Sequence, residues 1–394
     1  MKKIFLTVAL MVALTATGFA QSTVKVGIIL GFTGPIESLT ADMAPGAELA
    51  FKEASDSGIF LGGKRIKVIR GDSTCVDAGA ATAAAERLVT SDKVVAIMGA
   101  ACSGATTAVV NNVSVPNGVV TISPSATSPA LSTIRDKGYF FRTAPSDARQ
   151  GQVLAQVAID RGIKKIAVTF TNNDYGKGLA DSFVSAFKKL GGRVTINAPH
   201  EDGKADYSAE VGALAASGAS ELAVLGYVDQ GGLGIIQASL DAGAFKRFVV
   251  GDGMIGQSIV DKMGDDLIGT FGTLPGGVSE GRAMFVQMAT KAGVNAEGPY
   301  VTTSYDAAAL IVLAMQAAGS TNRRAIKNQV MKVANAPGEK ILPGEIAKAL
   351  KILKAGGDVD YVGASSVEFN KVGEVFGTYR ELEVKKSFQL IQVR

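Results

Sequence analysis

The sequence predicts an α/β fold with two doubly wound parallel-sheet lobes joined by a three-strand hinge. Short apolar runs typical of buried strands alternate with longer stretches that have the apolar spacing of helices, which indicates parallel sheets covered by helices. The alternation ends near Arg142 and then restarts, so two sheets are expected. With 394 residues the chain is also longer than one ordinary hydrophobic core requires.

The first run of this pattern is expected to build the first lobe. Its elements, in chain order, are strand Val24–Leu30, helix Ala44–Glu53, strand Ile66–Ile69, helix Ala78–Leu88, strand Val94–Met98, helix Ala105–Val113 and strand Val119–Ile122. Helical patterns resume late in the chain, at Arg282–Ala292, Val301–Ala318, Arg324–Val333 and Glu345–Leu353. The longest apolar run among them, Ala307–Met315, is too short to span a membrane and is expected to be a buried helix.

The second run is expected to build the second lobe. Its elements are helix Asp147–Asp160, strand Ile166–Phe170, helix Lys177–Leu190, strand Arg193–Ala198, helix Ser208–Ala216, strand Leu222–Leu225, helix Gln230–Ala242 and the strands Phe248–Val250 and Thr270–Thr273.

Three crossings between the lobes are expected, because structure-breaking residues stand at Thr143–Ser146 and Thr273–Gly277 and a third candidate lies near Lys371–Val375. The expected lobes are therefore residues 21–143 with 274–372, and residues 144–273 with 373–394. Three crossings form a hinge, so the cleft between the lobes could close on a ligand.

Residues 1–20 have the form of a cleavable export signal. Lys2 and Lys3 precede the apolar run Ile4–Leu14, and the small residues Gly18 and Ala20 stand before the expected cleavage site. No cysteine follows that site directly, so a lipid anchor is not expected. The product is expected to be soluble and periplasmic.

Composition argues against nucleic-acid binding and against catalysis. Lys and Arg are scattered among Asp and Glu, and the formal net charge is only +4. The one histidine, His200, stands beside Glu201 and Asp202 in a predicted polar loop and is expected to be solvated. The sequence has no Ser/His/Asp set, no His-rich metal spacing and no Walker-type loop, so no catalytic residue, metal or cofactor is expected.

The segment Gly251–Gly256 matches the glycine pattern of dinucleotide-binding loops and follows a predicted strand. Asp252 would put a negative charge beside the pyrophosphate, and Asp265 and Asp266 precede the next strand instead of ending it. The segment is better interpreted as a strand-end loop that faces the cleft, in which Asp252 receives a cation and the glycines allow close approach.

The two cysteines, Cys75 and Cys102, indicate one disulfide bond in an exported chain. Both follow strand-like runs, so the bond would fix the turn that begins at Cys102. Two buried free thiols are the alternative.

Two uncharged loops rich in small and hydroxyl residues, Gly99–Thr107 and Ser123–Pro129, each follow a predicted strand. In consecutive strand–helix units they would lie at the same edge of one sheet, with free N–H groups and the hydroxyls of Ser103, Ser125 and Thr127 directed at a small carboxylate.

The other lobe offers the opposite charge. Asp252 would receive an ammonium group, and Tyr175 and Tyr227 also stand at predicted strand ends, where their rings could wall a ligand or only pack the lobe. An α-amino acid carries both charges on one carbon and fits this arrangement.

At these residues the sequence resembles the branched-chain amino-acid-binding proteins of ABC importers, which have the type I periplasmic binding-protein fold. The resemblance runs from about Val24 to about Leu390, and its most specific parts are Gly99–Ser103, Ile122–Thr127, Phe141–Thr143, Tyr175–Gly178 and Gly298–Tyr300. It implies that the carboxylate is bound by Ala101, Cys102, Ser103, Ser125, Ala126 and Thr127. It also implies that Asp252 binds the amino group and that Tyr175 and Tyr227 line the cleft. The spacing of Cys75 and Cys102 is also typical of the family.

The resemblance further implies a periplasmic, monomeric, non-enzymatic protein that closes on a branched-chain or other hydrophobic amino acid and delivers it to an inner-membrane ABC permease. Three positions depart from the family pattern. Asp252 stands where the family often has Glu, and Leu39 and Thr302 stand at positions that are often aromatic. The departures predict a differently shaped pocket. The alternatives are a keto or aromatic acid without an amino group, a nucleotide-cofactor enzyme, and a sensory ligand-binding subunit.

Overall fold

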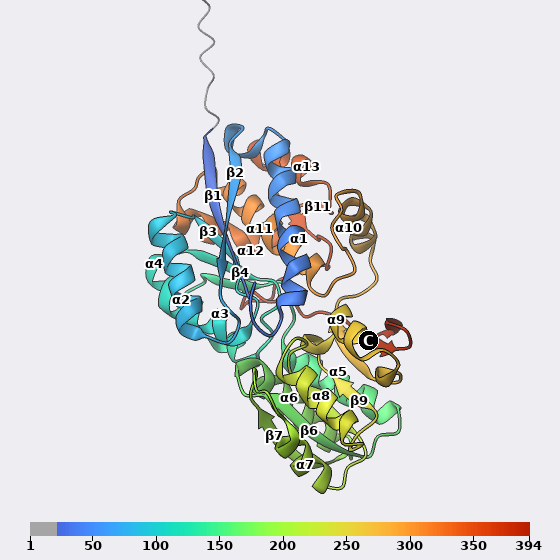
Figure 1. Cartoon of the computed structure of the whole chain (residues 1–394). Helices are drawn as coiled ribbons and strands as arrows, with labels where there is room; N and C mark the ends of the chain where they lie inside the picture. The colour runs from blue at the N-terminus through green and yellow to red at the C-terminus, as the bar shows by residue number, and fades with distance from the viewer. Residues whose placement is uncertain (1–21) are drawn as a thin grey trace, which may run out of the picture.

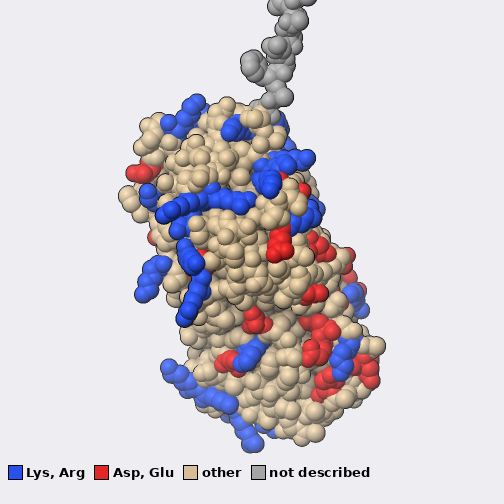
Figure 2. Space-filling view, turned by 90° about the vertical axis from the view of Figure 1, so that its left-hand side faces the viewer, with Lys and Arg blue, Asp and Glu red and all other residues tan. Residues whose placement is uncertain are grey.

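The computed structural model describes residues 22–394, which form two lobes stacked along one long axis (Figure 1). Each lobe contains a twisted sheet with helices packed on it. The predicted export signal, residues 1–20, lies outside the described residues. On the face drawn in Figure 2, basic side chains lie on both lobes, and most of the acidic side chains lie near the middle of the molecule and on the second lobe.

The first lobe contains a sheet of five parallel strands in the order β2-β1-β3-β4-β5. Its strands are β1 (Thr23–Leu30), β2 (Arg65–Asp72), β3 (Ala96–Gly99), β4 (Val120–Ser123) and β5 (Phe140–Arg142). Because all five are parallel, the carboxyl ends of β3 and β4 meet at one edge. The two predicted carboxylate loops therefore begin side by side.

The helices of this lobe come from both ends of the chain. They are α1 (Glu37–Asp56), α2 (Ala78–Glu86), α3 (Ser103–Val109), α4 (Val115–Asn117), α10 (Glu280–Lys291), α11 (Val301–Ala318), α12 (Arg323–Ala334) and α13 (Ile346–Lys354), with a small parallel pair β11 (Glu339–Ile341) and β12 (Val359–Tyr361). Of the described residues, only α11 forms a helix long and apolar enough to cross a membrane, and 89% of it is buried inside the protein. It is the central core helix of the lobe, as the apolar run predicted.

Helix α1 begins earlier than the sequence predicted, at Glu37 instead of Ala44, and Pro45 lies inside it. Because proline has no backbone N–H to donate, it favours the first turn of a helix, and the predicted helix start lies beside Pro45. Packing of α1 against α11 keeps the preceding turns helical.

The second lobe contains a seven-stranded sheet in the order β14-β13-β10-β9-β8-β6-β7. Its strands are β6 (Lys165–Thr171), β7 (Arg193–His200), β8 (Leu222–Leu225), β9 (Phe248–Val250), β10 (Phe271–Pro275), β13 (Tyr379–Val384) and β14 (Phe388–Val393), and its helices are α5 (Asp147–Asp160), α6 (Asp174–Lys189), α7 (Ser208–Ala216), α8 (Gly231–Asp241) and α9 (Gln257–Met263).

The doubly wound α/β fold is confirmed, with one addition. The hairpin β13–β14 extends the second sheet with antiparallel pairing. The sequence did not predict β14 because this strand is exposed along most of its length and therefore has no buried face to produce an apolar period.

The chain passes from one sheet to the other three times, at residues 143–146, 276–279 and 373–378. The first and third passages lie together, since Arg142 at the end of β5 forms a parallel bridge with Glu374.

Candidate functional site

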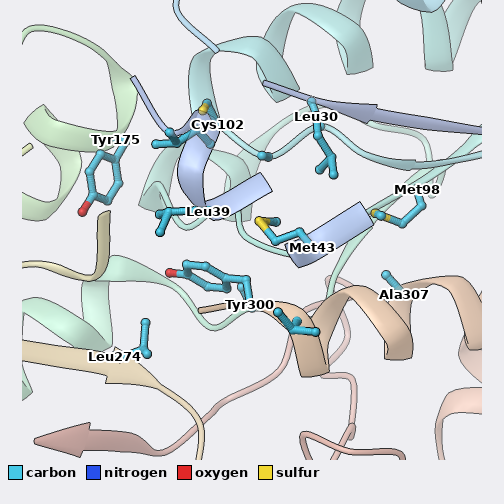
Figure 3. Close-up of a cluster of buried hydrophobic side chains, with 14 of the residues drawn as sticks. Leu30, Leu39, Met43, Met98, Cys102, Tyr175, Leu274, Tyr300 and Ala307 are labelled. Carbon is cyan, nitrogen blue, oxygen red and sulfur yellow. The ribbon is translucent and has the colours of Figure 1, made fainter. Parts of the chain in front are cut away.

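A small cavity of about 30 Å³ lies between the two sheets. Its walls are formed by Ile36, Leu39, Met43, Ala101, Cys102, Ser103, Ser125, Tyr175, Tyr227, Asp252, Gly253 and Tyr300. Tyr175 and Tyr300 approach this space from opposite lobes, Leu39 lies between them, and Met43 continues inward toward Met98 (Figure 3). The cavity is therefore walled by both lobes.

Seven of the nine predicted ligand-binding residues line this cavity: Ala101, Cys102, Ser103, Ser125, Tyr175, Tyr227 and Asp252. The other two, Ala126 and Thr127, are fully buried and do not form part of its wall.

The two loops after β3 and β4 are bonded to each other. The Ser125 hydroxyl donates to the Ala101 carbonyl over 3.0 Å, and the Ser128 backbone N–H donates to the Ser103 hydroxyl oxygen over 3.1 Å. Because Ser103 is an acceptor in this contact, its own hydroxyl hydrogen remains free to donate.

Gly99, the last residue of β3, fixes how closely this loop packs on the sheet. Its φ is +123°, and a Cβ at this position would lie 2.0 Å from the Ile29 carbonyl oxygen. Only glycine is compatible with that approach.

The predicted disulfide between Cys75 and Cys102 is confirmed, with the two Cα atoms 5.2 Å apart. It joins the segment after β2 to the first residue before α3. One wall of the cavity is thus covalently tied to the end of β2, two strands away in the sheet.

Asp252 lies at the start of the loop after β9, 2% exposed, and its carboxylate accepts two tyrosine hydroxyls. Tyr175 donates to Oδ1 over 3.0 Å, and Tyr300 donates to Oδ2. The Gly253 N–H in turn donates to the Tyr175 hydroxyl oxygen over 3.0 Å. Burial raises the pKa of the Asp252 carboxyl, and the hydrogen bonds from Tyr300 and Tyr175 oppose that rise.

The tyrosines of the second lobe form one wall. The rings of Tyr175 and Tyr227 stack with centroids 5.1 Å apart and planes 15° from parallel. Tyr175 is held at the start of α6 by the cap residue Asn173, whose side chain accepts its backbone N–H over 3.0 Å.

Sequence reasoning missed Ile36, Met43 and Tyr300 as wall residues. Tyr300 belongs to the segment Gly298–Tyr300, which marked the resemblance but carried no assigned role. Leu39 does line the cavity, whereas Thr302, within α11, does not. The aromatic wall residue near the start of α11 is Tyr300. It directly precedes the helix, and its hydroxyl reaches Asp252 of the opposite lobe.

The expectation of a solvated His200 was wrong. Strand β7 extends two residues further than predicted, and His200 is its last residue, 1% exposed. Its Nδ1 lies 2.9 Å from the Thr169 hydroxyl, and burial lowers its pKa to about 4. In residues 22–394, no group of three or more His, Cys, Asp or Glu side chains could hold a metal ion.

The outer rim of the cleft is bridged by direct hydrogen bonds. The Ser38 N–H donates to the Asp229 carboxylate over 2.8 Å, and the Asp229 N–H donates to the Pro35 carbonyl over 3.0 Å. Ser258 donates to the same carboxylate over 3.0 Å. These contacts join α1 of the first lobe to the loop after β8 of the second, so the lobes are closed.

Residues 23–347 match the family profile described as periplasmic binding protein. The chain belongs to the periplasmic binding protein family. A Leu/Ile/Val-binding protein homolog 1 of Brucella melitensis is 32% identical over 356 residues, which are 89% of this chain and 88% of that protein. An amino acid binding protein of Pseudomonas aeruginosa is 27% identical over 331 residues, 82% of this chain and 87% of that protein.

Solved structures share the fold of this periplasmic binding protein. The branched-chain amino acid transporter substrate-binding protein LivJ of Streptococcus pneumoniae, in complex with isoleucine, has a TM-score of 0.76 at 24% identity and covers 95% of this chain and 99% of its own. An ABC transporter solute-binding protein of R. palustris, in complex with 4-hydroxybenzoate, has a TM-score of 0.76 at 19% identity, with coverages of 95% and 97%.

Proposed function

We propose that this periplasmic binding protein is the solute-binding component of an ABC importer and closes on an α-amino acid. The observation that carries the proposal is the buried Asp252 carboxylate in one lobe, with the uncharged Ser103 and Ser125 loops of the other lobe in the same cavity wall. An α-amino acid presents an ammonium and a carboxylate on one carbon, and these two surfaces complement that pair of charges.

The carboxylate is assigned to the first lobe. Ser103 has a free hydroxyl hydrogen, and the Thr127 hydroxyl has no hydrogen-bond partner in good geometry. Ala101, Cys102 and Ala126 contribute backbone groups of the same two loops. None of these residues carries a charge, and their donors suit an anion.

The ammonium is assigned to Asp252. Each of its oxygens accepts one tyrosine hydroxyl, and each carboxylate oxygen can accept a second donor. Tyr175, Tyr227 and Tyr300 then surround the charged group and exclude water from it. The low local dielectric strengthens the ion pair.

The ligand's side chain is assigned to the wall formed by Ile36, Leu39 and Met43. These three side chains are apolar, which favours a branched-chain or other hydrophobic amino acid. The Leu/Ile/Val-binding names of the curated relatives support this class.

A keto or aromatic carboxylic acid is the second candidate. Asp252 is satisfied by two tyrosine hydroxyls without any ligand, so it could serve only to hold the tyrosines. Several solved proteins with this fold are complexes with benzoate derivatives.

A thermal-melting panel tests the choice. Ligand-free protein is heated with L-leucine, L-isoleucine, L-valine, L-alanine, 4-methyl-2-oxopentanoate and 4-hydroxybenzoate. A ligand at 100 times its Kd adds about 2.7 kcal/mol, a shift of several degrees. A shift with aliphatic amino acids and none with the keto acid is expected. A shift with the keto or aromatic acids alone would overturn the role of Asp252.

The cellular setting belongs to the same proposal. The chain is exported by a signal peptide that is cleaved after residue 20. It then acts as a soluble periplasmic monomer and delivers its ligand to an inner-membrane permease. The moving units are residues 21–143 with 274–372 and residues 144–273 with 373–394. The family membership of the chain supports this setting.

A further inference from the structure

Asp147 is a buried carboxylate with few donors around it. It is the first residue of α5, directly after the first passage between the sheets, and its side chain is 0% exposed. Neither of its carboxylate oxygens has a donor in good hydrogen-bond geometry, and the Thr127 hydroxyl is the one side-chain donor that acts on it. Its backbone N–H donates to the Thr127 carbonyl over 2.8 Å, which places it against the loop after β4. Sequence analysis assigned it no role.

The groups beside Asp147 are also incompletely bonded. The Thr127 hydroxyl and the Gln150 side-chain oxygen are buried without partners in good geometry, and Gln150 lies one helical turn further along α5. The Gln150 amide donates to the Thr273 carbonyl over 3.0 Å, in β10 shortly before the second passage between the sheets. Asp147 therefore occupies a buried, polar position between the hinge and the ligand site.

An ionised carboxylate is costly at such a position, because burial with few donors gives little compensation for lost hydration. The negative charge of Asp252 makes ionisation harder still. The pKa of Asp147 is well above its usual range, first because of burial and second because of the Asp252 charge, and the Thr127 hydroxyl and the Arg142 charge only partly oppose that rise.

The other groups facing Asp147 do not supply a counter-charge by direct contact. Arg142 attracts it, but the Arg142 guanidinium donates to Glu374, Ser132 and two backbone carbonyls. The remaining titratable groups that feel the Asp147 charge are tyrosine hydroxyls, those of Tyr175, Tyr227, Tyr300 and Tyr379.

We propose that Asp147 carries a proton in the ligand-free protein and releases it when a cationic amino group enters the cavity. The first half stands on the burial and scarce donors of Asp147 alone. The second half rests on the proposed function. An ammonium beside Asp252 cancels the charge that opposes ionisation, so the Asp147 O–H bond breaks, its electron pair stays on the carboxylate and the proton passes to solvent or buffer.

The ligand-free half is tested by unfolding the wild-type protein and Asp147→Asn in urea between pH 5 and 8. A carboxyl whose folded pKa is raised makes its largest contribution to stability at low pH and loses it as pH rises toward the folded pKa. Asp147→Asn is therefore expected to be more stable than the wild type at pH 8, with the difference shrinking toward pH 5. Asp181→Asn, at an exposed carboxylate paired with Lys177, is the matched control.

Parallel pH profiles for the wild type and Asp147→Asn, or a less stable Asp147→Asn at pH 8, would overturn this half. If the variant does not fold, infrared spectroscopy of ligand-free wild-type protein decides it. A protonated-carboxyl band at pH 7 supports the inference, and the absence of such a band refutes it.

The ligand half is tested by calorimetric titration with L-leucine at pH 6, in buffers with different heats of ionisation. Up to one proton released per L-leucine bound is expected for the wild type and none for Asp147→Asn. The wild-type Kd is also expected to rise by up to about tenfold per pH unit on acidification. Binding without proton release would overturn the inference. If no amino acid of the panel binds, the proposed function is wrong, and so is the proposed proton release on ligand binding. The urea comparison of ligand-free wild type and Asp147→Asn still decides whether Asp147 is protonated.

Discussion

Arg142 and Glu374 form a buried ion pair that joins the first and third passages of the chain between its sheets. Arg142 Nε lies 2.9 Å from Glu374 Oε2, and the Arg142 side chain is 1% exposed. The same guanidinium donates to the carbonyls of Ala126 and Ser128 over 3.1 and 2.9 Å. The hinge and the loop after β4 are therefore held by one side chain.

Replacing Arg142 by Met is expected to destabilise the protein by about 3–5 kcal/mol, because Glu374 and two carbonyls lose their donors in a buried position. Urea unfolding measures the loss. Glu374→Gln keeps an acceptor for the guanidinium and is expected to cost less. An Arg142→Met protein as stable as the wild type would show that the pair is not a structural link.

Asp252→Asn removes the charge and keeps an acceptor oxygen for one of the two tyrosine hydroxyls. The affinity for an L-amino acid is expected to fall by about 2–5 kcal/mol, since the ammonium would then be buried without a counter-ion. Calorimetric titration measures the change, with Asp181→Asn as the exposed control. An unchanged Kd would remove Asp252 from the binding site.

Asp229→Ala tests whether the rim contacts contribute to closure. The variant loses the bonds to the Ser38 N–H and the Ser258 hydroxyl, neither of which lines the cavity. A lost bond of this kind costs about 1.5 kcal/mol or more, so a Kd about tenfold higher is expected. Asp241→Ala, which removes only a contact with Gln237, provides the comparison. Equal affinities for the two variants would contradict a closing role for Asp229.

Changing both Cys75 and Cys102 to Ser is expected to lower stability by about 3–4 kcal/mol, because the bond closes a segment with a sequence separation of 27. Urea unfolding with and without dithiothreitol measures the effect. Reductant should destabilise the wild type toward the level of the double variant and leave the double variant unchanged. A wild type insensitive to reductant and matched in stability by the variant would argue against the bond's role.

The buried His200 is expected to lower the free energy of unfolding at acidic pH. Its pKa falls from 6.5 to about 4 on folding, so the folded state binds fewer protons than the unfolded chain. The stability that depends on neutral His200 is complete above pH 6.5 and is lost as pH falls through about 4, by about 3 kcal/mol in total. His200→Gln should flatten the unfolding profile between pH 6.5 and 4. An unaltered profile would mean that other groups set the acid limit.

The sequence predicted which loops meet at the cavity, because parallel strands end at a common edge of their sheet. Gly99 and Ser123 both close strands, so the loops that follow them had to meet. Asp252 was placed correctly for the same reason. Tyr300 was not, since it lies just before a helix, where no strand-end argument applies.

Asp147 escaped sequence reasoning for a different physical reason. An aspartate directly after a Ser at the start of a helix is commonly solvated, and its negative charge interacts favourably with the positive end of the helix dipole. Only the tertiary structure shows that α5 begins against the loop after β4, where the carboxylate is fully buried. Likewise, the apolar period that predicts strands gave no sign of β14, whose side chains mostly face solvent.

The tyrosines around Asp252 give this protein a built-in optical reporter. The chain contains eight tyrosines and no tryptophan, so its intrinsic emission comes from tyrosine alone. Tyr175, Tyr227 and Tyr300 all border the cavity, and two of them donate hydroxyl hydrogens to a carboxylate. Opening the lobes would break the hydrogen bond from Tyr300 to Asp252 and change a large part of the protein's tyrosine fluorescence. Closure can therefore be followed in the unlabelled protein, without a dye and without a tryptophan background.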